Sequence, residues 1–163
     1  MPRWFRITKT YCIGLFAVGL LLFFLQQLPY LVMPAIPMAA NPLVEMVDKI
    51  AVLNLAEKVL GVSCVLLMLF LLRDDTTWFS LKMPREKLWF AAAVAALVVY
   101  YAGWVLYFTG TQTLPVLLGI LVAMPPIYYS AIGLWRRNVP LAILGVVFLC
   151  VHMANVSVNL LGV

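Results

Sequence analysis

A carboxylate and an imidazole stand inside long apolar runs of this sequence, at Glu57 and His152, and His152 is the one histidine of the chain. An unpaired carboxylate in hydrocarbon is so costly that Glu57 has to be paired, hydrated or protonated. If helices carry these runs through a membrane, both residues lie at similar depth in its outer half. A carboxylate and an imidazole at one depth suit cation binding or acid–base chemistry, so they form the centre of a candidate site.

Other polar and aromatic side chains recur at helical spacing around these two. They predict a polar and aromatic pocket that opens outward, where Glu57 selects for charge, His152 and the asparagines donate or accept hydrogen bonds, and aromatic rings form a wall. The candidate ligand-binding residues are Glu57, His152, Asn54, Asn155, Asn159, Gln26, Tyr100, Trp104 and Tyr129.

A purely structural role is the alternative for each of these residues. Polar side chains in membrane bundles often only join helices, at about 0.6–2 kcal/mol per contact, and the asparagines and Gln26 fit that role. Lys58, next to Glu57, can extend outward and neutralise the carboxylate. A lone histidine on a helix is more often a hydrogen-bonded core residue than a ligand.

Metal and cofactor chemistry find no support in the residues. One histidine cannot supply bis-histidine haem ligation, and no Cys pair or carboxylate cluster completes a zinc or di-iron site. Cys12, Cys64 and Cys150 all lie in apolar runs and read as buried thiols. Nucleotide-binding and serine-nucleophile motifs are missing as well. We therefore expect no metal and no cofactor, and the sequence favours a protein that is not an enzyme.

Pro125 and Pro126 form a second local signal within an apolar run. Together they remove two backbone donors and crowd the carbonyls one turn earlier, at Leu121 and Val122. A kink near the middle of the membrane follows, either as a static bend or as a gating hinge.

The elements that must position these residues are membrane helices. Of the 163 residues, 66% are hydrophobic and only 10% are charged, whereas soluble domains are about half apolar and a quarter charged. Runs of about 20 apolar residues are long enough to cross a bilayer. The sequence predicts an all-α integral membrane protein in which five transmembrane helices form one bundle and one domain. The predicted spans are 10–33, 49–72, 88–109, 115–135 and 140–162.

Charge orients this bundle. Nine of the eleven Lys and Arg residues fall on one side of the five spans, in the N-terminus, the loop 73–87 and the turn 136–139. The positive-inside rule places that side in the cytoplasm and the C-terminus outside the cell. The flanking positions of these basic residues, together with the missing basic stripe, argue against nucleic-acid binding despite the net charge of +5. We expect a multi-pass protein of the cell membrane.

The outer loop, 34–48, contains several prolines that exclude a continuous helix. Asn41 followed by Pro42 predicts an N-cap and first helical residue of a helix that runs on to Leu72, and its first two turns should project beyond the membrane or lie along its outer surface.

Our leading hypothesis is a small membrane protein that binds or conducts a cationic or amphipathic small molecule through the outward pocket. One alternative is a non-catalytic accessory or immunity subunit, which contacts a membrane-protein partner or forms a parallel homo-oligomer. Small-residue faces such as Ala92, Ala96 and Gly103 would support it if exposed. Another alternative is a metal-independent lipid-modifying enzyme that uses Glu57 and His152 as an acid–base pair. In every case the bilayer is a partner.

Overall fold

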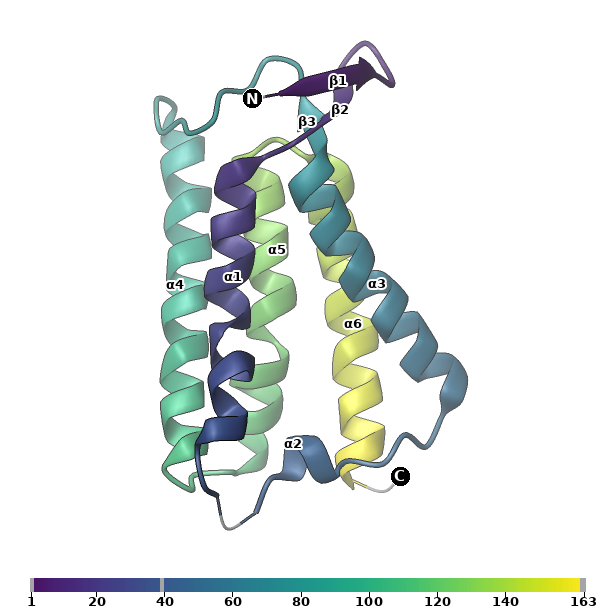
Figure 1. Ribbon diagram of the computed structural model, residues 1–163, viewed down its shortest axis with the longest axis vertical. Coiled ribbons are helices and arrows are strands. Elements are labelled where there is room, and N and C mark those ends of the chain that lie inside the picture. The colour runs from purple at the N-terminus through teal and green to yellow at the C-terminus, as the bar shows by residue number, and fades with distance from the viewer. Residues whose placement is uncertain (1, 39, 162–163) are drawn as a thin grey trace.

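The computed structural model describes residues 2–38 and 40–161. Five helical segments are long and apolar enough to cross a membrane, as the apolar runs predicted (Figure 1). The first is α1 (Ala17–Val32) with the 3-10 turn η1 (Met33–Ala35), followed by α3 (Ala51–Phe70), α4 (Pro84–Phe108), a π-helical segment η2 (Pro115–Val122) joined to α5 (Met124–Trp135), and α6 (Val139–Leu161).

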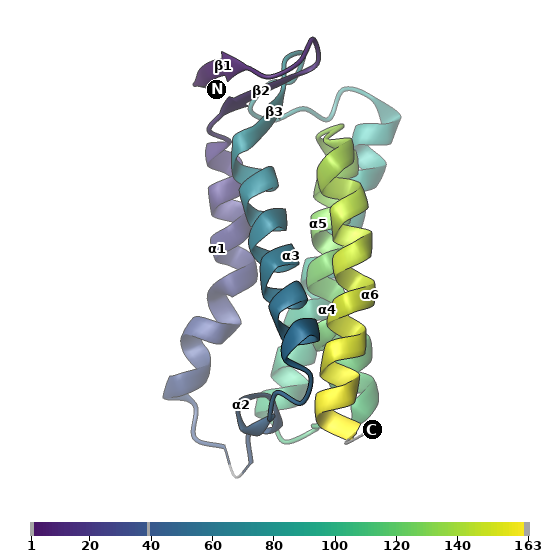
Figure 2. The ribbon, with the colours of Figure 1, turned by 90° about the vertical axis from the view of Figure 1, so that its right-hand side faces the viewer.

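Helices α4, α5 and α6 form an antiparallel row in chain order, and α5 and α6 approach each other closely. A Cβ added at Gly133 would lie 2.6 Å from the backbone nitrogen of Ala142, and one at Gly145 would lie 2.3 Å from Ser130 Oγ. The two glycines therefore let the backbones of α5 and α6 approach each other. Helix α3 leans on α6, whereas α1 lies beside α4 and α5 (Figures 1 and 2).

A three-stranded antiparallel sheet covers one end of the bundle (Figure 2). It consists of β1 (Arg3–Arg6), β2 (Tyr11–Gly14) and β3 (Leu71–Arg73), with Cys12 opposite Leu72. The predicted helical bundle is present, but this small sheet was not predicted, and the predicted start of the first span at residue 10 is wrong because α1 begins at Ala17. The apolar residues of β2 find strand partners that lie far away in the sequence, and only the tertiary fold brings these together. We call this end of the molecule the sheet end and the opposite end the α2 end.

The sheet fastens α1 to α3. Strand β2 leads into α1 after two residues, and β3 continues α3 without a break. At this junction the backbone N–H of Phe16 donates to the carbonyl of Leu69, at 2.8 Å. Phe16 is buried beneath the sheet, and so is the Leu72 side chain. The two helices are thus held together at the sheet end by strand pairing and by packing.

The predicted long helix from Pro42 to Leu72 is also wrong. The chain does begin a helix at Pro42 with Asn41 before it, but this helix, α2 (Pro42–Glu45), ends after one turn because Met46 adopts an extended conformation. The chain then runs in an irregular conformation until α3 begins at Ala51. The backbone of this irregular segment is anchored to α6, since the N–H of Lys49 donates to Asn159 Oδ1 at 3.0 Å. Only residue 39 of the predicted outer loop falls outside the described residues.

The other boundaries are close to those predicted. The third span begins at Pro84, one turn before the predicted residue 88, because the Glu86 carboxylate accepts hydrogen bonds from the backbone N–H groups of Lys82 and Met83. The fourth span covers the predicted range 115–135, and the fifth begins at Val139 with Pro140 in its first turn. Residue 162, the predicted end of the fifth span, lies outside the described residues.

The two adjacent prolines occupy the first turn of α5, where the π-helical segment ends. A proline ring crowds the carbonyl four residues before it, and the wider π turn shifts the hydrogen bonds there from i−4 to i−5. The N–H of Ala123 accordingly donates to the carbonyl of Leu118, at 3.1 Å. The helical ladder therefore changes register at the position where the prolines predicted a disturbance. A hinge motion at Pro125 and Pro126 stays a prediction.

Candidate functional site

Glu57 on α3 and His152 on α6 meet in the structure. The imidazole Nδ1 lies 3.0 Å from the carboxylate Oε1, and the two side chains are only 15% and 20% exposed. The two groups are in direct polar contact, although the ring N–H is not aligned for a linear hydrogen bond. The two polar stripes recognised in the sequence thus face each other across the α3–α6 contact.

A chain of amides supports the carboxylate from behind. Asn155 Nδ2 donates to Glu57 Oε2, and Asn159 Nδ2 lies 3.4 Å from Asn155 Oδ1. Asn159 in turn accepts the backbone hydrogen bond from Lys49. Both carboxylate oxygens therefore have partners, which explains how Glu57 is accommodated within an apolar helix. Asn155 and Asn159 act here on Glu57 and on the chain before α3.

Lys58 does not neutralise Glu57. Its Nζ lies 3.9 Å from Asp48 Oδ2, and Asn54 Nδ2 donates to the same carboxylate oxygen. Both side chains thus belong to an exposed cluster at the α2 end of α3. Asn54 is therefore separate from the other candidate residues, and the partner of Glu57 is His152.

The imidazole of His152 is fixed in orientation by stacking. Its ring lies 5.0 Å from that of Phe148, one turn earlier on α6, with 22° between the ring planes. Phe148 in turn lies against Gly61 of α3, where an added Cβ would approach the ring to 3.3 Å. With Nδ1 turned to the carboxylate, a neutral imidazole keeps Nε2 as its hydrogen-bond acceptor.

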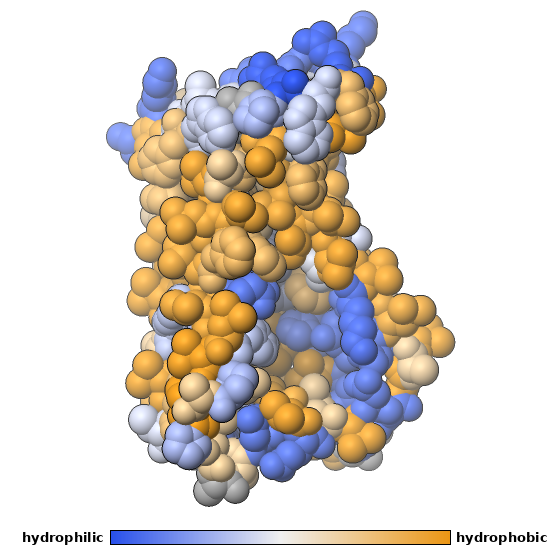
Figure 3. Space-filling model, in the orientation of Figure 1, coloured by the Kyte–Doolittle hydropathy of each residue, from blue (hydrophilic) through white to orange (hydrophobic). Residues whose placement is uncertain are grey.

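A cavity of about 420 Å³ lies beside His152 between α1, α3, α5 and α6. This volume falls within the range of about 300–1,000 Å³ that is typical of small-molecule sites. Figure 3 shows the recess between α1 and α3, with hydrophilic residues deep inside it. The cavity is lined by Phe23, Gln26, Gln27, Tyr30, Gly61, Val62, Val65, Leu66, Pro125, Tyr129, Phe148 and His152.

A second cluster of polar side chains, contributed by α1 and α5, lies across this cavity from His152. The buried Gln26 accepts hydrogen bonds at Oε1 from Tyr129 Oη, at 3.0 Å, and from Gln27 Nε2, at 2.8 Å. Its Nε2 lies 3.4 Å from Tyr100 Oη on α4. These contacts hold the α2-end half of α1 against α4 and α5, and they present amide and hydroxyl groups at the cavity wall.

The predicted site residues therefore divide into groups. Gln26, Tyr129, His152 and Pro125 line the cavity, while Glu57, Asn155 and Asn159 stand behind His152. Tyr100 lies behind Gln26. Trp104 belongs to a buried aromatic cluster, 5.0 Å from the ring of Tyr30 in an edge-on arrangement. Apart from Asn54, the sequence had thus singled out residues of one region, but it did not separate the residues that line the cavity from those that support them.

Several lining residues were not predicted. Val62, Val65 and Leu66 carry no sequence signal, because an apolar side chain on a membrane helix suits a cavity, the core or lipid equally well. Gln27 was recognisable only as the neighbour of Gln26, although its amide completes the polar wall. Among the described residues, no three His, Cys, Asp or Glu side chains gather in a way that could hold a metal ion.

No protein-family model, no curated protein and no solved structure matches this chain, so the geometry of the site alone bears on what the protein does.

Proposed function

We propose that this chain is a multi-pass protein of the cell membrane which binds a cationic or amphipathic small molecule in the cavity beside His152. The observation that carries the proposal is the Glu57–His152 pair at the wall of a cavity of about 420 Å³. An ionisable pair at membrane depth is costly to maintain for packing alone, and such pairs commonly mark ligand or ion sites.

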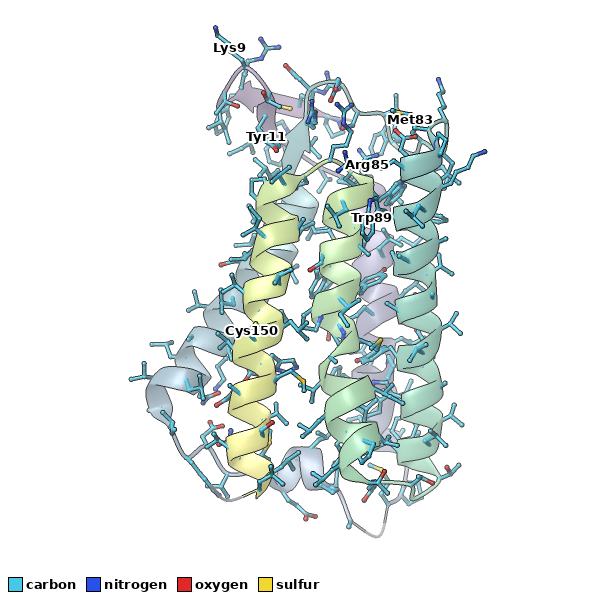
Figure 4. The ribbon with its side chains drawn as sticks, turned by 180° about the vertical axis from the view of Figure 1, so that it is seen from behind. Lys9, Tyr11, Met83, Arg85, Trp89 and Cys150 are labelled. Carbon is cyan, nitrogen blue, oxygen red and sulfur yellow. The ribbon has the colours of Figure 1, made fainter. Side chains whose placement is uncertain are left out.

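The orientation that we propose places the sheet end in the cytoplasm. Figure 4 shows Lys9, in the turn between β1 and β2, and Arg85, in the first turn of α4, at this same end. Arg136 and Arg137 also lie there, in the turn between α5 and α6, and β3 ends at Arg73. By the positive-inside rule the α2 end, to which the polar part of the cavity is closer, then faces outward.

Charge favours a cation as the ligand. The carboxylate of Glu57 places a negative charge beside the cavity wall, and Lys58 makes its ion pair with Asp48. The carboxylate acts on a ligand through the imidazole, whose Nε2 accepts a hydrogen bond from an ammonium group. Phe23, Tyr30 and Tyr129 add ring faces to the cavity, and such faces attract cations.

Binding of phenethylammonium, a small aromatic cation, to the protein in lipid nanodiscs tests the proposal. We expect Glu57→Gln to weaken binding more than tenfold, which corresponds to about 1.4 kcal/mol. The variant should be inserted in normal amounts, because glutamine keeps the shape of the side chain and one carbonyl oxygen. Lys58→Met, one residue away and outside the pair, is the matched control and should bind like the wild type.

Equal binding by the wild type and Glu57→Gln would contradict the proposal. So would loss of the folded protein in Glu57→Gln that a second substitution, Lys58→Met, repairs, because the carboxylate would then serve as the structural partner of Lys58.

An acid–base enzyme is the second candidate, and the 3.0 Å approach of imidazole to carboxylate is the observation that favours it. A carboxylate that orients an imidazole is the arrangement of a general base, which would activate water or a hydroxyl group at Nε2. Incubation of proteoliposomes with lipids that carry ester bonds, followed by mass spectrometry, tests it. Products that appear with the wild type and not with His152→Ala would support the enzyme.

The accessory-subunit alternative loses one of its supports. Ala96 and Gly103 are buried within the chain, and a Cβ at Gly103 would lie 2.4 Å from the side chain of Ile120 in η2. At Ala96 and Gly103 the small residues of α4 are therefore used to pack the neighbouring span, whereas Ala92 is partly exposed.

A further inference from the structure

Helices α1 and α3 diverge from the end at which they are joined (Figures 1 and 2). At the sheet end, strand pairing and the Phe16–Leu69 hydrogen bond hold them together. Further along, the polar contacts of α1 go to other helices. Tyr128 Oη donates to the carbonyl of Leu22, at 3.0 Å, and Tyr101 Oη donates to that of Leu25, at 2.6 Å.

The α2-end half of α3 makes its contacts elsewhere, with α6, through Glu57, His152 and Asn155. Since α1 follows α4 and α5 while α3 follows α6, a gap opens between α1 and α3 along the side of the bundle. Figure 3 shows this gap as a recess in the surface.

The gap reaches the surface that faces lipid. Val62 and Leu66 line the cavity, yet they are 60% and 50% exposed. Both lie within the apolar stretch of α3, Val62 near its middle and Leu66 one turn before its sheet end. Residues that belong at once to a cavity wall and to the lipid-facing surface mark a side opening, so the cavity communicates with the hydrocarbon layer.

The cavity also has a polar and an apolar end. At about 1.5 Å per residue, Leu66 and Phe23 lie roughly 6 and 9 Å from the sheet-end termini of their helices. By the same count His152 and Tyr30 lie about 20 Å from theirs. The apolar side chains therefore gather toward the sheet end, and the imidazole and amides stand toward the α2 end.

We infer that the ligand is a single-chain amphiphile with a primary ammonium head, which enters sideways from the bilayer through the gap between α1 and α3. This inference rests on the proposed function. In the proposed orientation, the head would meet His152 and Gln27 in the outer half of the membrane, and the chain would extend past the midplane along Val65 and Leu66. That is the orientation of an amphiphile in the outer leaflet.

A dodecylammonium probe with a diazirine near the end of its chain tests the inference in proteoliposomes. Illumination should attach it to the wild type at peptides of α1 and α3 that line the cavity. Val62→Trp fills the gap with a large ring and should reduce this labelling at least fivefold.

Val98→Trp is the matched control. Val98 lies within the apolar stretch of α4, is 62% exposed and does not line the cavity, so the same substitution there should label like the wild type. Leu66→Trp, at the apolar end of the opening, serves as a second blocking variant. Elution of each variant as a single peak in gel filtration shows that it is folded.

The outcomes separate the two proposals. Labelling of folded Val62→Trp and Leu66→Trp at the wild-type level would overturn sideways access. So would a loss of labelling in Val98→Trp as large as that in the two blocking variants. A wild type that binds phenethylammonium but is not labelled by the long-chain probe rejects the amphiphile while the proposed function stands. A wild type that takes up neither compound rejects the proposed function itself.

Discussion

His152 Nδ1 on α6 lies 3.0 Å from Glu57 Oε1 on α3, and this contact joins two helices that also meet through Asn155. A double-mutant cycle with Glu57→Gln and His152→Ala should give a coupling free energy of about 0.6–2 kcal/mol, because each single change leaves the other partner unmatched in an apolar setting. Unfolding in mixed micelles by titration with dodecyl sulfate measures it. Additivity within about 0.3 kcal/mol would mean that the contact carries no energy.

The close packing of α5 on α6 predicts that a substitution at Gly133 destabilises the protein. Gly133→Ala should lower the free energy of unfolding by about 1–3 kcal/mol, because the new methyl group would meet the backbone of Ala142. Gly119→Ala is the control, since a Cβ there meets nothing within 4 Å. The same micellar titration compares the two, and an equal effect of both substitutions would show that α5 and α6 do not pack this closely.

The proposed orientation predicts which ends of the chain a membrane-impermeant thiol reagent reaches in intact cells. In a cysteine-free background, Val47→Cys should be labelled, because this exposed residue lies at the α2 end. Thr77→Cys, exposed in the loop at the sheet end, should react only after the cells are permeabilised. The reverse pattern would invert the topology and place the polar part of the cavity toward the cytoplasm.

The contacts of Asp75 at the sheet end predict that the free energy of unfolding depends on pH. Burial alone would raise its pKa, but the hydrogen bond from Arg73, at 2.7 Å, and the charge of Arg137, at 2.9 Å, outweigh burial, so the pKa lies below its ordinary value. A depressed pKa stabilises the fold above the ordinary pKa, and the stabilisation is lost as the pH falls through the folded-state value.

Asp75→Asn should therefore reduce the free energy of unfolding at pH 7. The side chain of Asp75 is 48% exposed, so solvent screening limits the effect to about 0.5–1 kcal/mol. The difference between wild type and variant should shrink below about pH 4, where the unfolded carboxyl group becomes protonated. A difference that stays constant down to pH 2 would assign the effect to packing and not to charge.

The turn between α5 and α6 shows which features the local sequence predicts and which it does not. Arg136 and Arg137 predicted a turn at the membrane surface, since two arginines in mid-bilayer are costly, and the turn is there. Its internal contacts were not predictable. Arg136 is buried with its guanidinium 4.4 Å from the ring of Phe16, and burial lowers its pKa to about 10. Asn138 Nδ2 donates to the carbonyls of Leu67 and Leu71 at the end of α3.

The sequence by itself determined the number of spans, their positions to within a few residues at most ends, and the uneven distribution of charge. Each of these depends on composition within a short window, and hydrophobic transfer energies add up along such a window without reference to the rest of the chain. Glu57 and His152 were recognisable for the same reason, since an ionisable residue in an apolar run is unusual wherever its partner lies.

Only the tertiary structure decided which residues meet. The pairing of Tyr11–Gly14 with Leu71–Arg73, the choice of His152 over Lys58 as the partner of Glu57, and the gap between α1 and α3 all join segments that are distant in sequence. Val62 and Leu66 are the clearest case. Lipid, core and cavity are all apolar surroundings for such side chains, so their transfer energies do not distinguish the three, and only the packing of neighbouring helices does.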